Sequence, residues 1–290
     1  LGEHISGAIL YDETIRQSTK AGVPFTKVMM DNGIIPGIKV DKGPQPLAGF
    51  PGEVATEGLD GLRERLKEYY GLGARFAKWR AVITIGKDIP SEYCIWTNAH
   101  ALARYAALCQ EGGLVPIVEP EVLMDGEHTI ERSFEVTSHT LHAVFTELRD
   151  QRVHPEGILL KPNMVLPGYE SSEQVSDEEI AHQTVQCFRR HVPAAVPGIV
   201  FLSGGQSEEE ATRRLVVMNC PPPAMASRPY FFVSVAISSG VGSTTSIHDT
   251  LGSLSTKSSS MTFRAMSGGL DPVTPPANGK RVAETHAEIV

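Results

Sequence analysis

Lys161 is the residue whose position most directly suggests chemistry. It ends the apolar run Gly157-Ile-Leu-Leu-Lys161, which is typical of a strand, and Pro162 follows it. Burial at the end of a strand disfavours the charged form of a lysine. A neutral amine attacks ketones and aldehydes and forms a Schiff base. Lys161 is therefore the candidate nucleophile.

Three other apolar runs carry charged residues two positions apart. Alternate residues of a strand share a face, so the members of each pair point the same way. On a barrel, all three pairs would meet Lys161 at one mouth. A single pair of this kind is more often a solvated salt bridge, but several buried charges together indicate a functional cluster. The pairs are Lys39 and Asp41, Lys78 and Arg80, and Glu119 and Glu121.

A glycine turn supplies the third chemical feature. In Phe201-Leu-Ser-Gly-Gly-Gln-Ser207 a strand passes through Ser203, Gly204 and Gly205 into a helix. Backbone N–H groups at such a turn, together with the helix dipole, form a cradle for an anion. Glycine turns of this kind are common, but at the seventh strand of a barrel the turn predicts a phosphate site.

The elements that position these residues alternate between strand and helix. This order predicts a parallel sheet, and the charged strand ends favour a (β/α)8 barrel over an open sheet. The Gly-x-Gly-x-x-Gly turn of dinucleotide folds is absent. Leucine spacing predicts a helix over 58–69, and Ser176 and Ser207 begin capping boxes. The predicted strands cover 7–11, 34–40, 76–83, 114–122, 158–165 and 199–203.

Composition limits the class of protein. The chain has 290 residues, 41% hydrophobic residues and a net charge of −8, which argues against general nucleic-acid binding. No apolar run approaches the roughly 20 residues of a membrane helix. The four cysteines are scattered, which indicates reduced thiols in an intracellular, cytoplasmic protein. His139 and His142 have the spacing of metal ligands but no supporting cluster, so we expect no metal and no other cofactor.

The chain divides at about residue 219. Residues 1–219 carry the barrel pattern, and residues 220–290 are rich in Ser, Thr, Gly and Pro. Within the second part only residues 230–237 have the pattern of a strand, and we expect the rest to be largely disordered.

Six blocks, in order, resemble class I fructose-bisphosphate aldolase. The resemblance runs from about Ser6 to Asn219 and implies an incomplete TIM barrel that holds the family's strands 2–7 and an aberrant strand 8. The blocks are Gly37-Ile-Lys-Val-Asp-Lys-Gly43, Thr56-Glu-Gly-Leu-Asp-Gly61, Phe76-Ala-Lys-Trp-Arg80, Pro116-Ile-Val-Glu-Pro-Glu121, Leu160-Lys-Pro-Asn-Met164 and Phe201-Leu-Ser-Gly-Gly-Gln-Ser-Glu-Glu-Glu210.

The resemblance implies metal-independent cleavage of fructose 1,6-bisphosphate into dihydroxyacetone phosphate and glyceraldehyde 3-phosphate, a step of glycolysis. Lys161 matches the Schiff-base lysine, Glu119 the proton shuttle, and Lys78 the cation beside the nucleophile. Glu121 and Asp41 match polar residues of the pocket wall. Lys39 and Arg80 would bind one phosphate, and Ser203, Gly204 and Gly205 the other. The family is commonly tetrameric, so the resemblance implies a homo-oligomer.

The chain also departs from the family's pattern. The Ala-Ala-Asp-Glu-Ser-type segment of the first strand precedes the resemblance, the stretch at 230–237 has no arginine, and no tyrosine ends the chain. We hypothesise a sequence that is partial at its start and changes reading frame or exon near residue 219. Two alternatives stay open: an impaired aldolase fragment that acts as a binding or heteromer partner, and a Schiff-base lyase for smaller phosphosugars.

Overall fold

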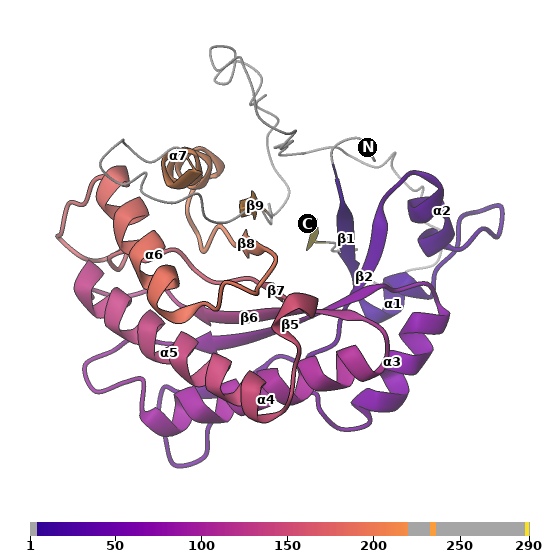
Figure 1. Ribbon diagram of the computed structural model, residues 1–290, viewed down its shortest axis with the longest axis horizontal. Helices are drawn as coiled ribbons and strands as arrows, with labels where there is room; N and C mark the ends of the chain where they lie inside the picture. Colours follow the sequence, from indigo (N-terminus) through magenta and orange to yellow (C-terminus); the bar gives the residue numbers. More distant parts are fainter. Residues whose placement is uncertain (1–4, 220–232, 236–287, 290) are drawn as a thin grey trace, which may run out of the picture.

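A curved sheet of eight strands forms the centre of the fold (Figure 1). The computed structural model describes residues 5–219, 233–235 and 288–289. All neighbouring strands of this sheet are parallel except the first pair. Their order is β10 (Glu288–Ile289), β1 (Gly7–Leu10), β2 (Ile35–Lys39), β5 (Phe76–Ile83), β6 (Val115–Val122), β7 (Leu159–Leu160), β8 (Ile199–Phe201) and β9 (Val233–Val235).

Helices follow the strands and cover the outer face of the sheet (Figure 1). β3 (Pro44–Pro46) and β4 (Val54–Thr56) form a separate antiparallel pair. Six parallel strands linked by helices confirm the predicted fold class, an incomplete (β/α)8 barrel. The helices are α1 (Asp12–Ile15), α2 (Phe25–Asp31), α3 (Leu62–Gly71), α4 (Glu92–Glu111), α5 (Ile130–Asp150), the 3-10 turn η1 (Pro155–Gly157), α6 (Asp177–His191) and α7 (Glu208–Asn219).

Serine and threonine side chains begin the longer helices. The capping box at Ser207 is complete: its Oγ accepts from the Glu210 N–H at 3.2 Å, and the Glu210 carboxylate accepts from the Ser207 N–H at 3.0 Å. The box at Ser176 is half formed, because Ser176 Oγ accepts from the Glu179 N–H while the Glu179 carboxylate accepts from Gln183. Ser91 and Thr129 cap α4 and α5 in the same way; the sequence analysis did not identify these two caps.

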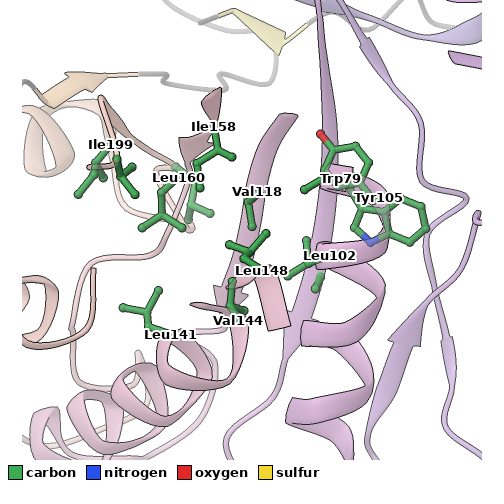
Figure 2. Close-up of a cluster of buried hydrophobic side chains, with 14 of the residues drawn as sticks. Trp79, Leu102, Tyr105, Val118, Leu141, Val144, Leu148, Ile158, Leu160 and Ile199 are labelled. Atoms are coloured by element: carbon green, nitrogen blue, oxygen red, sulfur yellow. The ribbon is translucent and has the colours of Figure 1, made fainter. Parts of the chain in front are cut away.

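The main core lies between the sheet and its outer helices (Figure 2). Trp79 of β5 and Tyr105 of α4 are fully buried, with ring centroids 5.6 Å apart. The Tyr105 hydroxyl lies 2.6 Å from the Ala77 carbonyl oxygen, to which it donates, so α4 is held to the sheet by a buried polar contact as well. Successive strands contribute Val118, Leu160 and Ile199 to this core, and α5 contributes Leu141, Val144 and Leu148.

The inner face of the sheet is layered. An apolar layer made of Ile9, Phe76, Ile117 and Val200 lies towards the amino ends of the strands. Phe76 packs so closely on β2 that a Cβ at Gly37 would lie 2.2 Å from its ring, which only glycine avoids. Because residues two positions further along a strand share its face, this layer places charged residues directly above it.

β7 is much shorter than the predicted strand at 158–165. Its ladder ends after Leu160, where Lys161 N–H still donates to the Val118 carbonyl at 2.8 Å. Pro162 has no N–H for a further bond. Beyond it the Asn163 side chain replaces the main chain, since its Oδ1 accepts from the Val122 N–H at 3.0 Å. Pro120 lies inside β6 on this same edge, where β7 has already ended and no donor is needed.

α7 ends at Asn219, and the domain boundary expected at about this residue stays a prediction. β9 falls inside the predicted strand at 230–237. The expected disorder from residue 238 onward concerns residues that, apart from β10, lie outside those described. Within the described ranges, no helix combines the length and apolar character needed to cross a bilayer.

Candidate active site

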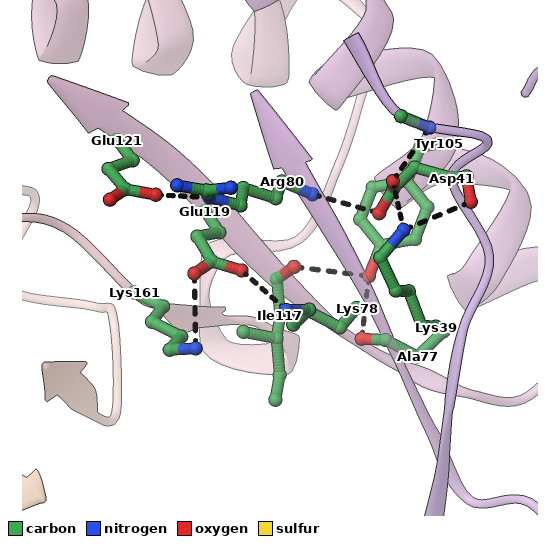
Figure 3. A network of polar contacts seen from close by, with 11 residues as sticks. Lys39, Asp41, Ala77, Lys78, Arg80, Tyr105, Ile117, Glu119, Glu121 and Lys161 are labelled. Atoms are coloured by element: carbon green, nitrogen blue, oxygen red, sulfur yellow. Dashed lines mark hydrogen bonds and ion pairs between the residues drawn. The ribbon is translucent and has the colours of Figure 1, made fainter. Parts of the chain in front are cut away.

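The charged pairs of β5 and β6 lie side by side on the inner face of the sheet (Figure 3). Their ladder joins eight residue pairs, from Phe76 opposite Val115 to Ile83 opposite Val122. This long register fixes the directions in which the side chains of both strands point, alternately to the inner and the outer face of the sheet. Lys78 and Arg80 therefore project beside Glu119 and Glu121, as the strand parity predicts.

Glu119 lies between two lysines at the deepest point of this cluster. Its Oε1 lies 3.0 Å from Lys161 Nζ, and its Oε2 lies 3.3 Å from Lys78 Nζ. The three side chains are between 1% and 3% exposed. Oε2 makes an ion pair with Lys78 but no hydrogen bond. One buried carboxylate thus stands between two amines.

A second set of charges surrounds this trio and is more open to solvent. Lys39 pairs with Asp41, and Arg80 pairs with Glu121. Asp41 is further fixed by backbone donors, the N–H groups of Arg80 at 3.2 Å and Gly43 at 3.1 Å. The side chains of Lys39 and Arg80 are 21% and 40% exposed, so both cations remain accessible to an incoming ligand.

The ion pairs of the cluster join four cationic side chains to three anionic ones. Charge–charge interactions in a water-poor pocket are several times stronger than in bulk solvent. The accessible cations Lys39 and Arg80 therefore favour an anionic ligand. An amine, a carboxylate at hydrogen-bonding distance from it and cations further out can together form a Schiff base with a phosphorylated carbonyl compound.

The glycine turn predicted to bind an anion follows β8. Gly204 and Gly205 have φ angles of +59° and +90°, a left-handed conformation that favours glycine. The Ser203 carbonyl accepts from the Gln206 N–H at 3.1 Å and from Gln206 Nε2 at 2.8 Å. Among the described residues, the N–H groups of Gly204 and Gly205 donate to no acceptor, so they are available to an anion.

Sequence reasoning missed two residues that support this site. Asn163 is 1% exposed and joins β6 to the segment that carries Lys161. Strand parity could have identified it, because it lies two positions after the nucleophile. Tyr169 lies in the loop after β7, and its hydroxyl donates to the Gly204 carbonyl. Nothing in the local pattern indicates this contact, because the two residues are 35 positions apart.

Among the described residues, the cysteines and histidines take no part in the ion pairs of the charged cluster. Burial raises the pKa of Cys94 and of Cys187 to about 11, and burial also raises that of Cys109. These three are free thiols. His139 and His142 lie on α5, and within the described part of the chain no three His, Cys, Asp or Glu side chains gather as a metal site would require.

Comparison with known proteins gives consistent results. The family model "Fructose-bisphosphate aldolase class-I" matches residues 1–235. The "Probable fructose-bisphosphate aldolase class 1" of Xylella fastidiosa strain 9a5c is 66% identical over 219 residues, which cover 76% of this chain and 66% of that protein. The "Fructose-bisphosphate aldolase 5, cytosolic" of Arabidopsis thaliana is 60% identical over 215 residues, which cover 74% of this chain and 60% of that protein.

A solved structure agrees with these sequence matches. It is fructose-bisphosphate aldolase from Plasmodium falciparum, in complex with TRAP and a small molecule inhibitor. The sequence identity is 49% and the TM-score 0.77, over 81% of this chain and 67% of that one. The chain spans 66% of the length of the Xylella relative.

Proposed function

The chain belongs to the class I fructose-bisphosphate aldolase family, and we propose that it cleaves fructose 1,6-bisphosphate through a Schiff base on Lys161. The observation that carries the proposal is the buried contact of 3.0 Å between Lys161 Nζ and Glu119 Oε1. It places a nucleophilic amine within reach of one carboxylate that can accept and return its protons. The products would be dihydroxyacetone phosphate and glyceraldehyde 3-phosphate.

In this mechanism Lys161 attacks the ketone carbon of the sugar. Glu119 passes two protons in turn from the Lys161 nitrogen to the ketone oxygen. The first transfer frees the amine for attack and completes the carbinolamine hydroxyl, and the second lets that hydroxyl leave as water, so an iminium forms. As the hydroxyl on the carbon next to the breaking bond gives its proton to Glu119, the iminium accepts the electron pair of the carbon–carbon bond and the aldehyde half departs. The enamine that remains takes the proton back, and water hydrolyses the resulting iminium to release the ketone half, so the sequence needs no metal ion. Lys78 lies 3.3 Å from the other oxygen of Glu119, where its positive charge holds that carboxylate in place.

The two phosphates would bind on either side of the amine. Arg80 and Lys39 are accessible cations for the phosphate of the aldehyde half, while Asp41 and Glu121 hold them in position as part of the pocket wall. The turn at Ser203, Gly204 and Gly205 offers N–H groups to the phosphate of the ketone half. Anchoring both ends restricts the sugar to orientations in which its carbonyl meets Lys161.

Borohydride reduction tests the proposal directly. Incubation with dihydroxyacetone phosphate and sodium borohydride should fix a secondary amine on Lys161, and peptide mass spectrometry locates it. A folded protein that forms no adduct indicates a binding or heteromer partner instead of an enzyme. Efficient adduct formation only with a smaller phosphosugar indicates a different Schiff-base lyase.

We further propose a homotetramer in the cytoplasm. Membership in the family supports the assembly, and relatives named as cytosolic support the location. Light scattering during size-exclusion chromatography measures the assembly, and a mass of about 31 kDa for the folded chain would contradict it. Cell fractionation with a matched antibody tests the location.

A further inference from the structure

Tyr169 ties three successive loops of the barrel together. Its own N–H donates to the Met124 carbonyl of the loop after β6 at 2.9 Å. Its hydroxyl reaches the turn after β8 and donates to the Gly204 carbonyl at 2.5 Å. The adjacent Gly168 packs so tightly that an added Cβ would lie 2.1 Å from the Gly126 carbonyl oxygen. The tyrosine therefore extends from a firmly held backbone.

The bond to the Gly204 carbonyl has a consequence for the neighbouring N–H. In a trans peptide the C=O and the N–H of the same unit point in opposite directions. The Gly204 carbonyl shares its peptide with the Gly205 N–H, so fixing one fixes the direction of the other. Tyr169 thereby sets where the Gly205 donor points.

The preceding peptide is held in a comparable way by a different set of side chains. Gln206 Nε2 donates to the Ser203 carbonyl at 2.8 Å, which sets the direction of the Gly204 N–H. Arg214 in turn donates to Gln206 Oε1 at 2.7 Å and to Asp177 at 2.8 Å. Donors from within the fold thus occupy both carbonyls of the turn, and neither N–H group donates to an acceptor among the described residues.

The positive φ angles of Gly204 and Gly205 favour glycine at both positions, and the same neighbours crowd these positions. A Cβ at Gly204 would lie 2.2 Å from the Met124 methyl carbon, and one at Gly205 would lie 3.1 Å from the Tyr169 hydroxyl oxygen. Partial burial, the largest cause, raises the pKa of Tyr169 to about 12. The phenol consequently remains a hydrogen-bond donor throughout the neutral range.

We propose that Tyr169 is a positioning residue for phosphate recognition, which it promotes by holding the Gly205 N–H towards the phosphate of the ketone half. This inference rests on the proposed function for the identity of the ligand, a ketose phosphate. The contribution of Tyr169 to ligand affinity is specific to ligands that carry this phosphate, because Tyr169 acts through the turn and not through Lys161.

The test compares two ketones that differ only in the phosphate. Borohydride trapping on Lys161 is measured against increasing dihydroxyacetone phosphate and against dihydroxyacetone. Loss of one hydrogen bond in Tyr169→Phe should raise the half-saturating concentration of the phosphorylated ketone roughly 3- to 10-fold. Trapping of dihydroxyacetone should not change. Tyr93→Phe is the matched control, since Tyr93 is similarly exposed, 55% against 51%, and lies on α4.

Three results would overturn the inference. They are equal trapping curves for Tyr169→Phe and the wild type, equal losses for both ketones, and an equal effect of Tyr93→Phe. Thermal unfolding of each variant shows whether a loss reflects a damaged fold.

A wild-type protein that traps neither ketone contradicts the proposed function, and a second measurement then decides on Tyr169. Inorganic phosphate, titrated by isothermal titration calorimetry, reports on the turn without any reaction of Lys161. A lower phosphate affinity in Tyr169→Phe supports the inference, and an unchanged affinity overturns it.

Discussion

The charged cluster of β5 and β6 and the turn after β8 are two different ways to build a site for anions. The first uses charged side chains on adjacent strands, whose ladder of eight residue pairs fixes each of them. The second uses backbone N–H groups after a strand of three residues, Ile199–Phe201. Side chains from distant segments, Tyr169 and Gln206, hold those groups in place.

This difference shows where each region is vulnerable. In the cluster every charge has a charged partner, so a substitution changes local charge while the strand register holds the geometry. A substitution that removes a hydrogen bond to the turn leaves the charges of the protein unchanged. It does, however, free one peptide of the turn to rotate. We therefore expect substitutions in the cluster to change reaction rate and stability, and substitutions around the turn to change ligand affinity.

The largest effect should come from Lys161→Met, which replaces the amine with an uncharged side chain of similar length. No Schiff base can form, so borohydride should fix no adduct. Glu119 keeps its ion pair with Lys78, so the fold should persist. Lys39→Met is the control at a more exposed lysine, and it should still form an adduct. An adduct of undiminished yield in Lys161→Met would mean that another amine reacts.

Glu119→Gln should have the next largest effect. It tests whether the buried trio of Glu119, Lys78 and Lys161 behaves differently from the more exposed ion pairs around it. Loss of the proton shuttle should slow adduct formation roughly 100- to 10,000-fold. Because two buried amines then lose their shared carboxylate, unfolding free energy should fall by about 3 kcal/mol or more. Rapid-quench trapping and chemical denaturation measure the two quantities.

Glu121→Gln is the matched control two residues further along β6. Its partner Arg80 is 40% exposed, so the lost ion pair should cost less than about 1 kcal/mol. Equal destabilisation by the two substitutions would show that burial does not distinguish the inner trio from the outer pairs.

The same contrast explains how far the sequence predicts the structure. β5 matches its predicted range, and the pairing of Lys78 and Arg80 with Glu119 and Glu121 follows from strand parity. Alternation along a strand is a local property, so one sequence suffices to see it. The turn at Gly204 and Gly205 was also predictable, because only glycine adopts such φ angles readily.

The contacts that complete the site were not predictable in this way. β7 ends early because the Asn163 side chain replaces a ladder bond, and an asparagine in an apolar run does not reveal its partner. The bond from Tyr169 to Gly204 depends on how two loops meet. Such contacts follow from the tertiary arrangement, which residue spacing does not encode.

Asn163→Ala tests the joint between β6 and the segment that carries Lys161. It leaves the buried Val122 N–H without an acceptor and removes a bond of 3.1 Å to Thr137. An unsatisfied buried donor should lower the unfolding free energy by about 1–3 kcal/mol. Thr137→Val removes only the second bond and should cost less, as measured by chemical denaturation. An equal loss in both variants would mean that the bond to Val122 contributes little.

The smallest effect should come from Ser207→Ala, at the start of α7 just beyond the turn. Loss of this helix cap should lower the unfolding free energy by about 1 kcal/mol. The Ser207 hydroxyl is also the first cause, before the Ser207 N–H, that lowers the pKa of Glu210. A carboxylate with a lowered folded pKa stabilises the protein above its unfolded pKa of about 4.3, and this contribution is lost as the pH falls through the folded pKa.

The difference between wild type and Ser207→Ala should therefore be greatest near neutral pH and should shrink below about pH 4. Ser176→Ala is the matched control, because the Ser176 cap lacks the bond to its glutamate carboxylate. Its effect should change less with pH in denaturation curves collected from pH 3 to pH 7. Since Gln206 and Tyr169 still hold the two carbonyls of the turn, Ser207→Ala should weaken phosphate binding less than Tyr169→Phe does. A larger loss would show that the start of α7, and not the carbonyl contacts, orients the turn.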